Sequence, residues 1–60
     1  MNEDITGLIA EYEIAVKWHR ENADLYRKST KPQDVYQEGY EDACAEMCAN
    51  FIIVLKELNE

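Results

Sequence analysis

The segment from Asp34 to Leu58 places its apolar residues at the period of an α-helix. Six of them follow one another at intervals of 4, 3, 4, 3 and 4 residues, which puts them in one row: Tyr40, Cys44, Met47, Phe51, Val54 and Leu58. Four further residues widen this row into a broad stripe: Tyr36, Ala43, Cys48 and Leu55. Residues 51–55 are apolar on every side of the helix. Such a helix needs neighbours on more than one face, so we expect packing by its own chain and by a second copy.

A second helical pattern precedes this segment. One face is apolar and is interrupted only by His19: Ile5, Leu8, Ile9, Tyr12, Ala15, Val16, Ala23 and Tyr26. Basic residues at 27, 28 and 31 suit the end of a helix, and Pro32 disfavours helical geometry at the residue before it. The sequence therefore predicts two helices, about 4–29 and 33–58, joined by about five residues as an antiparallel hairpin.

Two details of the second helix follow from its first turns. Its start is predicted either at Pro32, with Thr30 or Lys31 as the cap, or at Asp34, paired with Gln37 in a capping box. Gly39 lies inside the helical pattern, where we expect it to allow close approach of another backbone.

The chain is short for a self-sufficient core. Its 60 residues form one domain, 1–60. A domain of this size buries only about 60% of the surface of its unfolded chain, so disulfides, metals or oligomerisation usually add stability. Only two cysteines are present, which is too few for a disulfide framework. We therefore expect a homodimer in which two hairpins form a four-helix bundle.

A second apolar stripe supports the homodimer. Ile14, Trp18 and Leu25 lie beside the main face of the first helix, and a single hairpin has no evident use for them. Tryptophan is enriched at protein interfaces. The predicted dimer interface combines this stripe with the end of the second helix: Ile14, Trp18, Leu25, Phe51, Ile52 and Leu55.

The net charge of −7 restricts the classes of partner. Residues 1–16 carry four acidic and no basic residues, residues 17–31 have a net charge of +3, and residues 32–60 have −6. This balance disfavours nucleic acid and anionic membranes. The longest apolar run is also far shorter than the ~20 residues that span a bilayer, and we expect no secretory signal and a cytoplasmic location.

Acidic residues gather on the first half of the second helix. Glu38, Glu41, Asp42 and Glu46 recur at helical spacing and are predicted to form a docking face for a partner with a basic surface. A metal-dependent hydrolase is the alternative, because such enzymes hold Mg²⁺ with Glu-x-x-Glu pairs. In the first helix, Glu11 and Glu13 do not share one face. We therefore predict that the chain is not an enzyme.

Three residues could be combined into a zinc site. Cys44, Cys48 and His19 fall on the apolar sides of the two helices. The cysteine spacing differs from that of zinc knuckles, and free cysteine is usually a small core residue. We expect both cysteines to be core residues, His19 to be a packed or hydrogen-bonded histidine, and no metal or other cofactor to be bound.

Basic residues gather near the predicted turn. They are Lys17, Arg20, Arg27, Lys28 and Lys31. Glu21 and Asp24 interrupt them, so ordinary solvated charge is the favoured interpretation. The alternative function that this stretch allows is the binding or sequestration of a small anionic ligand such as a nucleotide.

The segment Tyr36-Gln37-Glu38-Gly39-Tyr40-Glu41-Asp42-Ala43, followed by an apolar helix, resembles the second helix of short helical-hairpin proteins encoded by bacteriophages and prophages. The resemblance covers residues 34–58. It implies a protein that binds and inhibits a host or defence protein. Together with the charge it predicts a small acidic protein-binding module that acts by occupying a surface.

Overall fold

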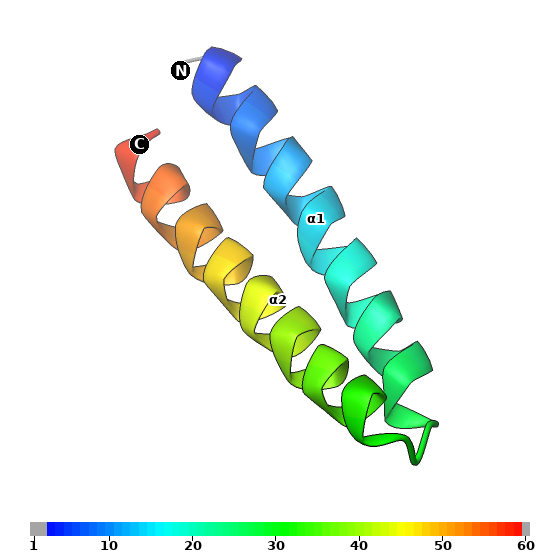
Figure 1. Ribbon diagram of the computed structural model, residues 1–60. Coiled ribbons are helices and arrows are strands. Elements are labelled where there is room, and N and C mark those ends of the chain that lie inside the picture. The colour runs from blue at the N-terminus through cyan, green and yellow to red at the C-terminus, as the bar shows by residue number, and fades with distance from the viewer. Residues whose placement is uncertain (1–2, 60) are drawn as a thin grey trace.

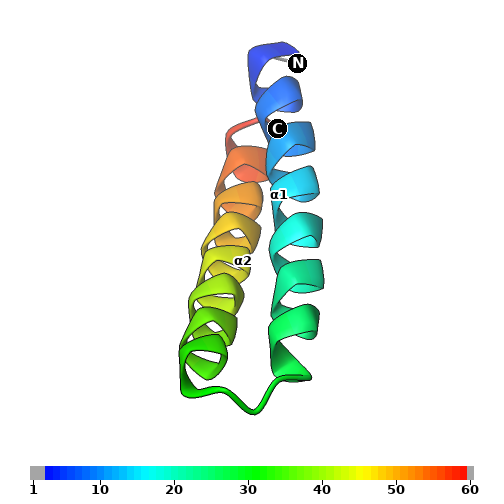
Figure 2. The same cartoon turned by 45° about the vertical axis from the view of Figure 1, so that its right-hand side comes forward.

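The computed structural model describes residues 3–59, which form two α-helices lying side by side (Figures 1 and 2). Helix α1 spans Glu3–Arg27 and helix α2 spans Pro32–Leu58. They run antiparallel, with both ends of the chain opposite the connecting turn, and the hairpin measures 46 × 14 × 11 Å. The predicted all-α hairpin is confirmed, with helix ends within two residues of those expected.

The turn shows why the helices end where they do. After Arg27 the Ser29 N–H donates to the Tyr26 carbonyl at 3.0 Å, and the Ser29 hydroxyl accepts from the Lys31 N–H at 3.2 Å. Lys31 has extended geometry, φ −75° and ψ 135°, as expected before a proline. Pro32 then opens α2 at a position where its missing N–H costs nothing. Of the two predicted starts, the one at Pro32 is confirmed and the one at Asp34 is wrong.

The two helices meet at small side chains. Val16 and Ala23 of α1 and Ala45 of α2 are the buried apolar residues among those described. Half-buried residues surround them on the predicted face of α1, including Ile9 and Tyr12, so the position of that face is confirmed. The core is small: no large side chain in the described part of the chain is fully buried.

Helix α2 is rotated relative to the position that its apolar row predicts. The contact with α1 is made by a neighbouring stripe: Glu41, Ala45, Cys48, Ile52 and Leu55. Two causes are visible. Small Ala45 allows close approach to α1, and Glu41 pairs with a side chain of α1. Most of the predicted row is therefore exposed, from 50% for Val54 to 67% for Leu58, and only Cys44 of its six members is half-buried.

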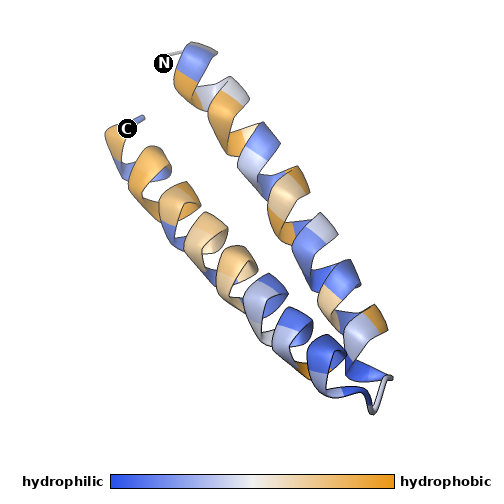
Figure 3. Cartoon of the chain, viewed as in Figure 1, coloured by the Kyte–Doolittle hydropathy of each residue, from blue (hydrophilic) through white to orange (hydrophobic). Residues whose placement is uncertain are grey.

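Hydropathy is distributed unevenly along α2. Figure 3 shows apolar colouring toward the C-terminal end of α2 and polar colouring around the turn. Gly39 lies in the polar half, and a Cβ atom built there would meet nothing within 4 Å. The predicted close backbone approach at Gly39 is therefore wrong for the isolated hairpin. Within the described residues, neither helix contains a stretch long and apolar enough to cross a membrane.

Candidate interaction surface

The hairpin has two long flanks of opposite character. Arg20 of α1 and Ile53 of α2 line the same groove, so they share one flank. Trp18 and Phe51 each precede these residues by two positions, which is about 200° around a helix. Trp18 and Phe51 therefore lie on the opposite flank. We call the two sides the groove flank and the apolar flank.

The apolar flank carries most of the exposed large apolar residues. Those that lie on it by helical phase are Leu8, Trp18, Leu25, Tyr36, Tyr40, Met47, Phe51, Val54 and Leu58. Tyr12 and Phe51 stack across the two helices with ring centroids 5.6 Å apart, which makes the flank continuous from α1 to α2. A shallow hollow of about 260 Å³ lies between Met47, Phe51 and Val54. Large contiguous apolar patches are a feature of interaction sites on soluble proteins, so the apolar flank is the candidate interaction surface.

The predicted dimer-interface residues divide into two groups. Ile14, Trp18 and Leu25 are exposed on the outer and apolar sides of α1, and Phe51 is exposed on the apolar flank. Ile52 and Leu55 instead lie half-buried in the contact between α1 and α2. The first group is accessible to another molecule, whereas the second already contributes to the hairpin itself.

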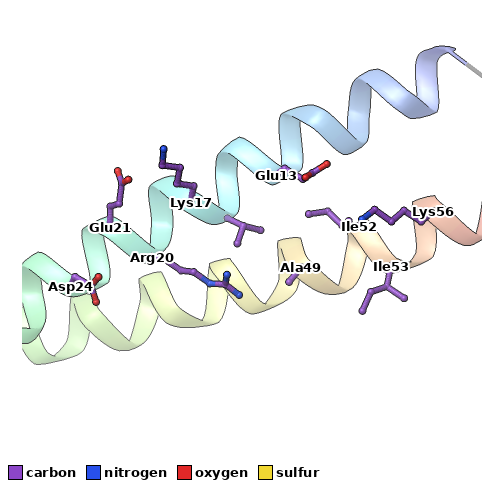
Figure 4. A pocket seen from close by; sticks show the side chains of 10 residues that line it. Glu13, Lys17, Arg20, Glu21, Asp24, Ala49, Ile52, Ile53 and Lys56 are labelled. Carbon is purple, nitrogen blue, oxygen red and sulfur yellow. The ribbon is translucent and has the colours of Figure 1, made fainter.

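The groove flank is shallow, with an apolar floor and a charged rim (Figure 4). Its volume is about 590 Å³, and Val16, Ala49, Ile52 and Ile53 form the floor. The rim has three cations and three acids: Lys17, Arg20, Lys56, Glu13, Glu21 and Asp24. In Figure 4 the Lys17 and Glu21 side chains point away from α2, while Arg20 extends toward it.

A hydrogen-bonded pair of side chains joins the helices near the middle of the hairpin. The His19 Nδ1 and Glu41 Oε2 atoms lie 2.5 Å apart, and Glu41 is the one buried charged residue among those described. The Trp18 ring packs edge-on against the imidazole, with centroids 5.0 Å apart. His19 is therefore hydrogen-bonded, as predicted, and its carboxylate partner comes from the other helix.

A charged cluster lies near the turn and is exposed. Arg27 Nε donates to Glu38 at 2.9 Å, and its guanidinium also reaches Asp24 and Asp42. The hydrogen bond with Glu38 raises the pKa of Arg27 above its usual value. Arg27 thus neutralises part of the acidic run that the sequence places on α2.

These contacts divide the predicted acidic face. Glu41 is buried against His19, and Glu38 and Asp42 are bound by Arg27. Glu46 is exposed at a position farther along the helix. Of the four residues predicted for this face, Glu46 and, in part, Asp42 therefore remain available to another molecule.

The cysteines occupy ordinary helical positions. Cys44 and Cys48 are both free and half-buried. A hydrogen bond with Cys44 raises the pKa of the Tyr40 hydroxyl above its usual value. Over the residues that the structure describes, no three His, Cys, Asp or Glu side chains converge in a way that could hold a metal ion.

Comparison of the chain with protein-family models, curated proteins and solved structures found no match. The candidate site is therefore defined by the surface itself.

The contact between His19 and Glu41 was not predicted from the sequence. An antiparallel hairpin that turns near residue 30 pairs residues whose numbers add up to about 60, as 19 and 41 do. That register could have placed Glu41 beside His19. The apolar row of α2 predicted a different rotation, because that prediction rested on apolar residues alone and gave no weight to a hydrogen bond between the helices.

Proposed function

We propose that the chain is a protein-interaction module whose apolar flank is covered by a second copy, giving a homodimeric four-helix bundle. The observation that carries the proposal is the contrast between a core of small residues, such as Ala23 and Ala45, and the large residues left exposed, such as Trp18 and Phe51. A bundle of four helices encloses residues of this kind.

The accessible area supports this assembly. The hairpin exposes 4709 Å², whereas a compact monomer of 7.0 kDa exposes about 4000 Å². The excess of about 700 Å² is close to the roughly 800 Å² that each partner buries in a standard protein interface. Burial of the apolar flank would bring the chain to the surface area of an ordinary folded protein.

The dimer would present a strongly acidic exterior to other proteins. Each copy has a net charge of −7, and Asp42 and Glu46 remain exposed on α2. We place its target among proteins with a basic surface, which the dimer would occupy and block. The phage-like pattern of residues 36–43 favours a bacterial host or defence protein as that target.

Capture from bacterial lysate tests the binding function. A tagged wild-type chain should retain one stoichiometric protein at low salt and lose most of it at high salt, because exposed charges are screened. Reversal of the exposed acids, Asp42→Lys with Glu46→Lys, should abolish capture and leave the dimer intact. The matched control is reversal of two exposed acids of the other helix that line the groove flank, Glu13→Lys with Glu21→Lys. Absence of any stoichiometric partner, or equal loss with both variants, would contradict the proposal.

The groove flank supports a second candidate function, the binding of a small organic anion. Lys17, Arg20 and Lys56 surround an apolar floor, and the volume of about 590 Å³ lies within the range of ligand sites. A nucleotide that raises the unfolding temperature of the wild-type chain, but not that of an Arg20→Gln variant, would support this function. No shift with mono-, di- or triphosphates would contradict it.

A further inference from the structure

We propose that the two copies pack antiparallel, with α2 of one against α2 of the other and the two-fold axis at the level of Met47. This inference rests on the proposed dimer and specifies its geometry. It names a single occupant for the apolar flank, a second copy in one orientation.

The first argument is the continuity of the apolar row on α2. From Tyr36 to Leu58 this row is exposed along its length, apart from half-buried Cys44. The corresponding row on α1 is interrupted, because Glu11 and Asn22 fall between Leu8 and Leu25 at similar helical phase. Contact of α2 with α1 of the partner would set this apolar row against Glu11 and Asn22. Contact of α2 with α2 sets apolar side chains against each other.

Symmetry then fixes the direction. In this arrangement the apolar flanks of the two copies face each other, and α2 of one copy contacts α2 of the other. The two-fold axis that relates them is then perpendicular to the helices, so the two α2 helices run antiparallel. Residue 47 is the midpoint between Tyr36 and Leu58. An axis at that level brings Met47 against the partner's Met47. The larger residues of one half, such as Phe51, then meet the Tyr40–Cys44 end of the other copy.

Charge is consistent with this orientation. In α1 the first half is acidic, with a net charge of −4 over residues 3–16, and the second half is weakly basic, with +1 over residues 17–27; Lys28 and Lys31 in the turn add two positive charges. In the antiparallel arrangement α1 lies beside α1 of the other copy, so each acidic half is next to a basic half. On α2 the strongly acidic residues 32–46 face residues 47–58, which hold one acid and one base. The arrangement avoids direct contact between like-charged halves.

Distances between spin labels at the turn test the orientation. The label is placed on Lys31→Cys in a chain that also carries Cys44→Ala and Cys48→Ala, and light scattering first confirms the mass of this chain. Antiparallel packing places the two turns at opposite ends, with a separation close to the 46 Å length of the hairpin. A separation of about 20 Å, two interhelical spacings, would overturn the antiparallel orientation and leave the dimer standing. A mass of one chain would contradict the dimer itself and, with it, this inference.

A measurement on the unsubstituted chain gives an independent answer. Isotope-filtered NMR of a mixed dimer, one copy labelled and one unlabelled, detects contacts between copies only. The proposal predicts contacts of the Met47 methyl group with the other copy's α2, including its Phe51 ring. Contacts of the Met47 methyl with the other copy's Trp18 ring, and none with its α2, would overturn the proposed packing.

Discussion

His19 on α1 and Glu41 on α2 form a hydrogen-bonded pair that joins the two helices, with 2.5 Å between His19 Nδ1 and Glu41 Oε2. Glu41 is 7% exposed and is thus held in the narrow contact between small residues. The rotation of α2 that brings Glu41 to His19 also leaves the larger apolar residues on the outside. The hydrogen-bonded pair between the helices and the exposed apolar flank therefore result from the same packing of α2 on α1.

Removal of His19 should destabilise the protein strongly. In a His19→Leu variant the Glu41 carboxylate stays buried without its partner, and we expect a loss of about 3 kcal/mol in the free energy of unfolding. The double variant with Glu41→Leu should recover much of this loss, because it leaves no unpaired buried charge. Urea unfolding at one fixed protein concentration measures both, and Asp24→Asn, in an exposed pair with Arg27, is the control. Equal stability of the His19→Leu variant and the wild type would show that the pair does not hold the helices together.

Truncation of a residue on the apolar flank should weaken the dimer. Phe51 and Ile53 are similarly exposed in the hairpin, at 51% and 56%, but lie on opposite flanks. Phe51→Ala should cost about 3 kcal/mol of association energy, which raises the dimer Kd by about 100-fold. Ile53→Ala serves as the matched control and should leave the Kd within a fewfold of wild type. Trp18→Ala should resemble Phe51→Ala, and a larger effect for Ile53→Ala would move the interface to the groove flank.

Higher salt should strengthen the association of two copies. Each copy carries a net charge of −7, so two copies repel each other over the length of the interface. Salt screens this repulsion and leaves the burial of apolar surface intact. Sedimentation velocity at 50 mM and 500 mM NaCl should therefore show a lower dimer Kd at the higher concentration. A higher Kd at 500 mM would mean that attraction between opposite charges dominates the interface.

Replacement of Gly39 by alanine should stabilise the chain. Gly39 lies inside α2, has no positive φ angle, and offers open space to a Cβ atom. Alanine is favoured over glycine in a helix interior by roughly 1 kcal/mol. Gly7, in α1, has equally open surroundings and should behave alike. Thermal unfolding compares the three chains, and destabilisation by Gly39→Ala alone would indicate that another copy approaches the helix at this point.

The sequence was sufficient to predict the hairpin. Helical periodicity predicted both helices, and the Lys31-Pro32 step located the turn, because these signals depend on residues close together in the chain. The apolar face of α1 was predicted correctly for the same reason. Its buried members Val16 and Ala23 lie within the expected row.

The rotation of α2 could not be predicted from its apolar residues alone. Periodicity shows that a helix has an apolar row but does not show which neighbour covers it. Here Ala45 and Glu41 face α1, while Met47 and Phe51 face outward. The acidic run was likewise predicted to form a single face. The bonds of Glu38 to Arg27 and of Glu41 to His19 divide it, and these bonds depend on the register between the helices, which the acidic residues alone do not show.

The molecular mass in solution tests the central claim most directly. Sedimentation equilibrium of the wild-type chain at micromolar concentration should give twice the 7.0 kDa of a single chain, and the Phe51→Ala variant should shift toward one chain at the same concentration. A wild-type mass of 7.0 kDa across the micromolar range would contradict the proposal that a second copy covers the apolar flank.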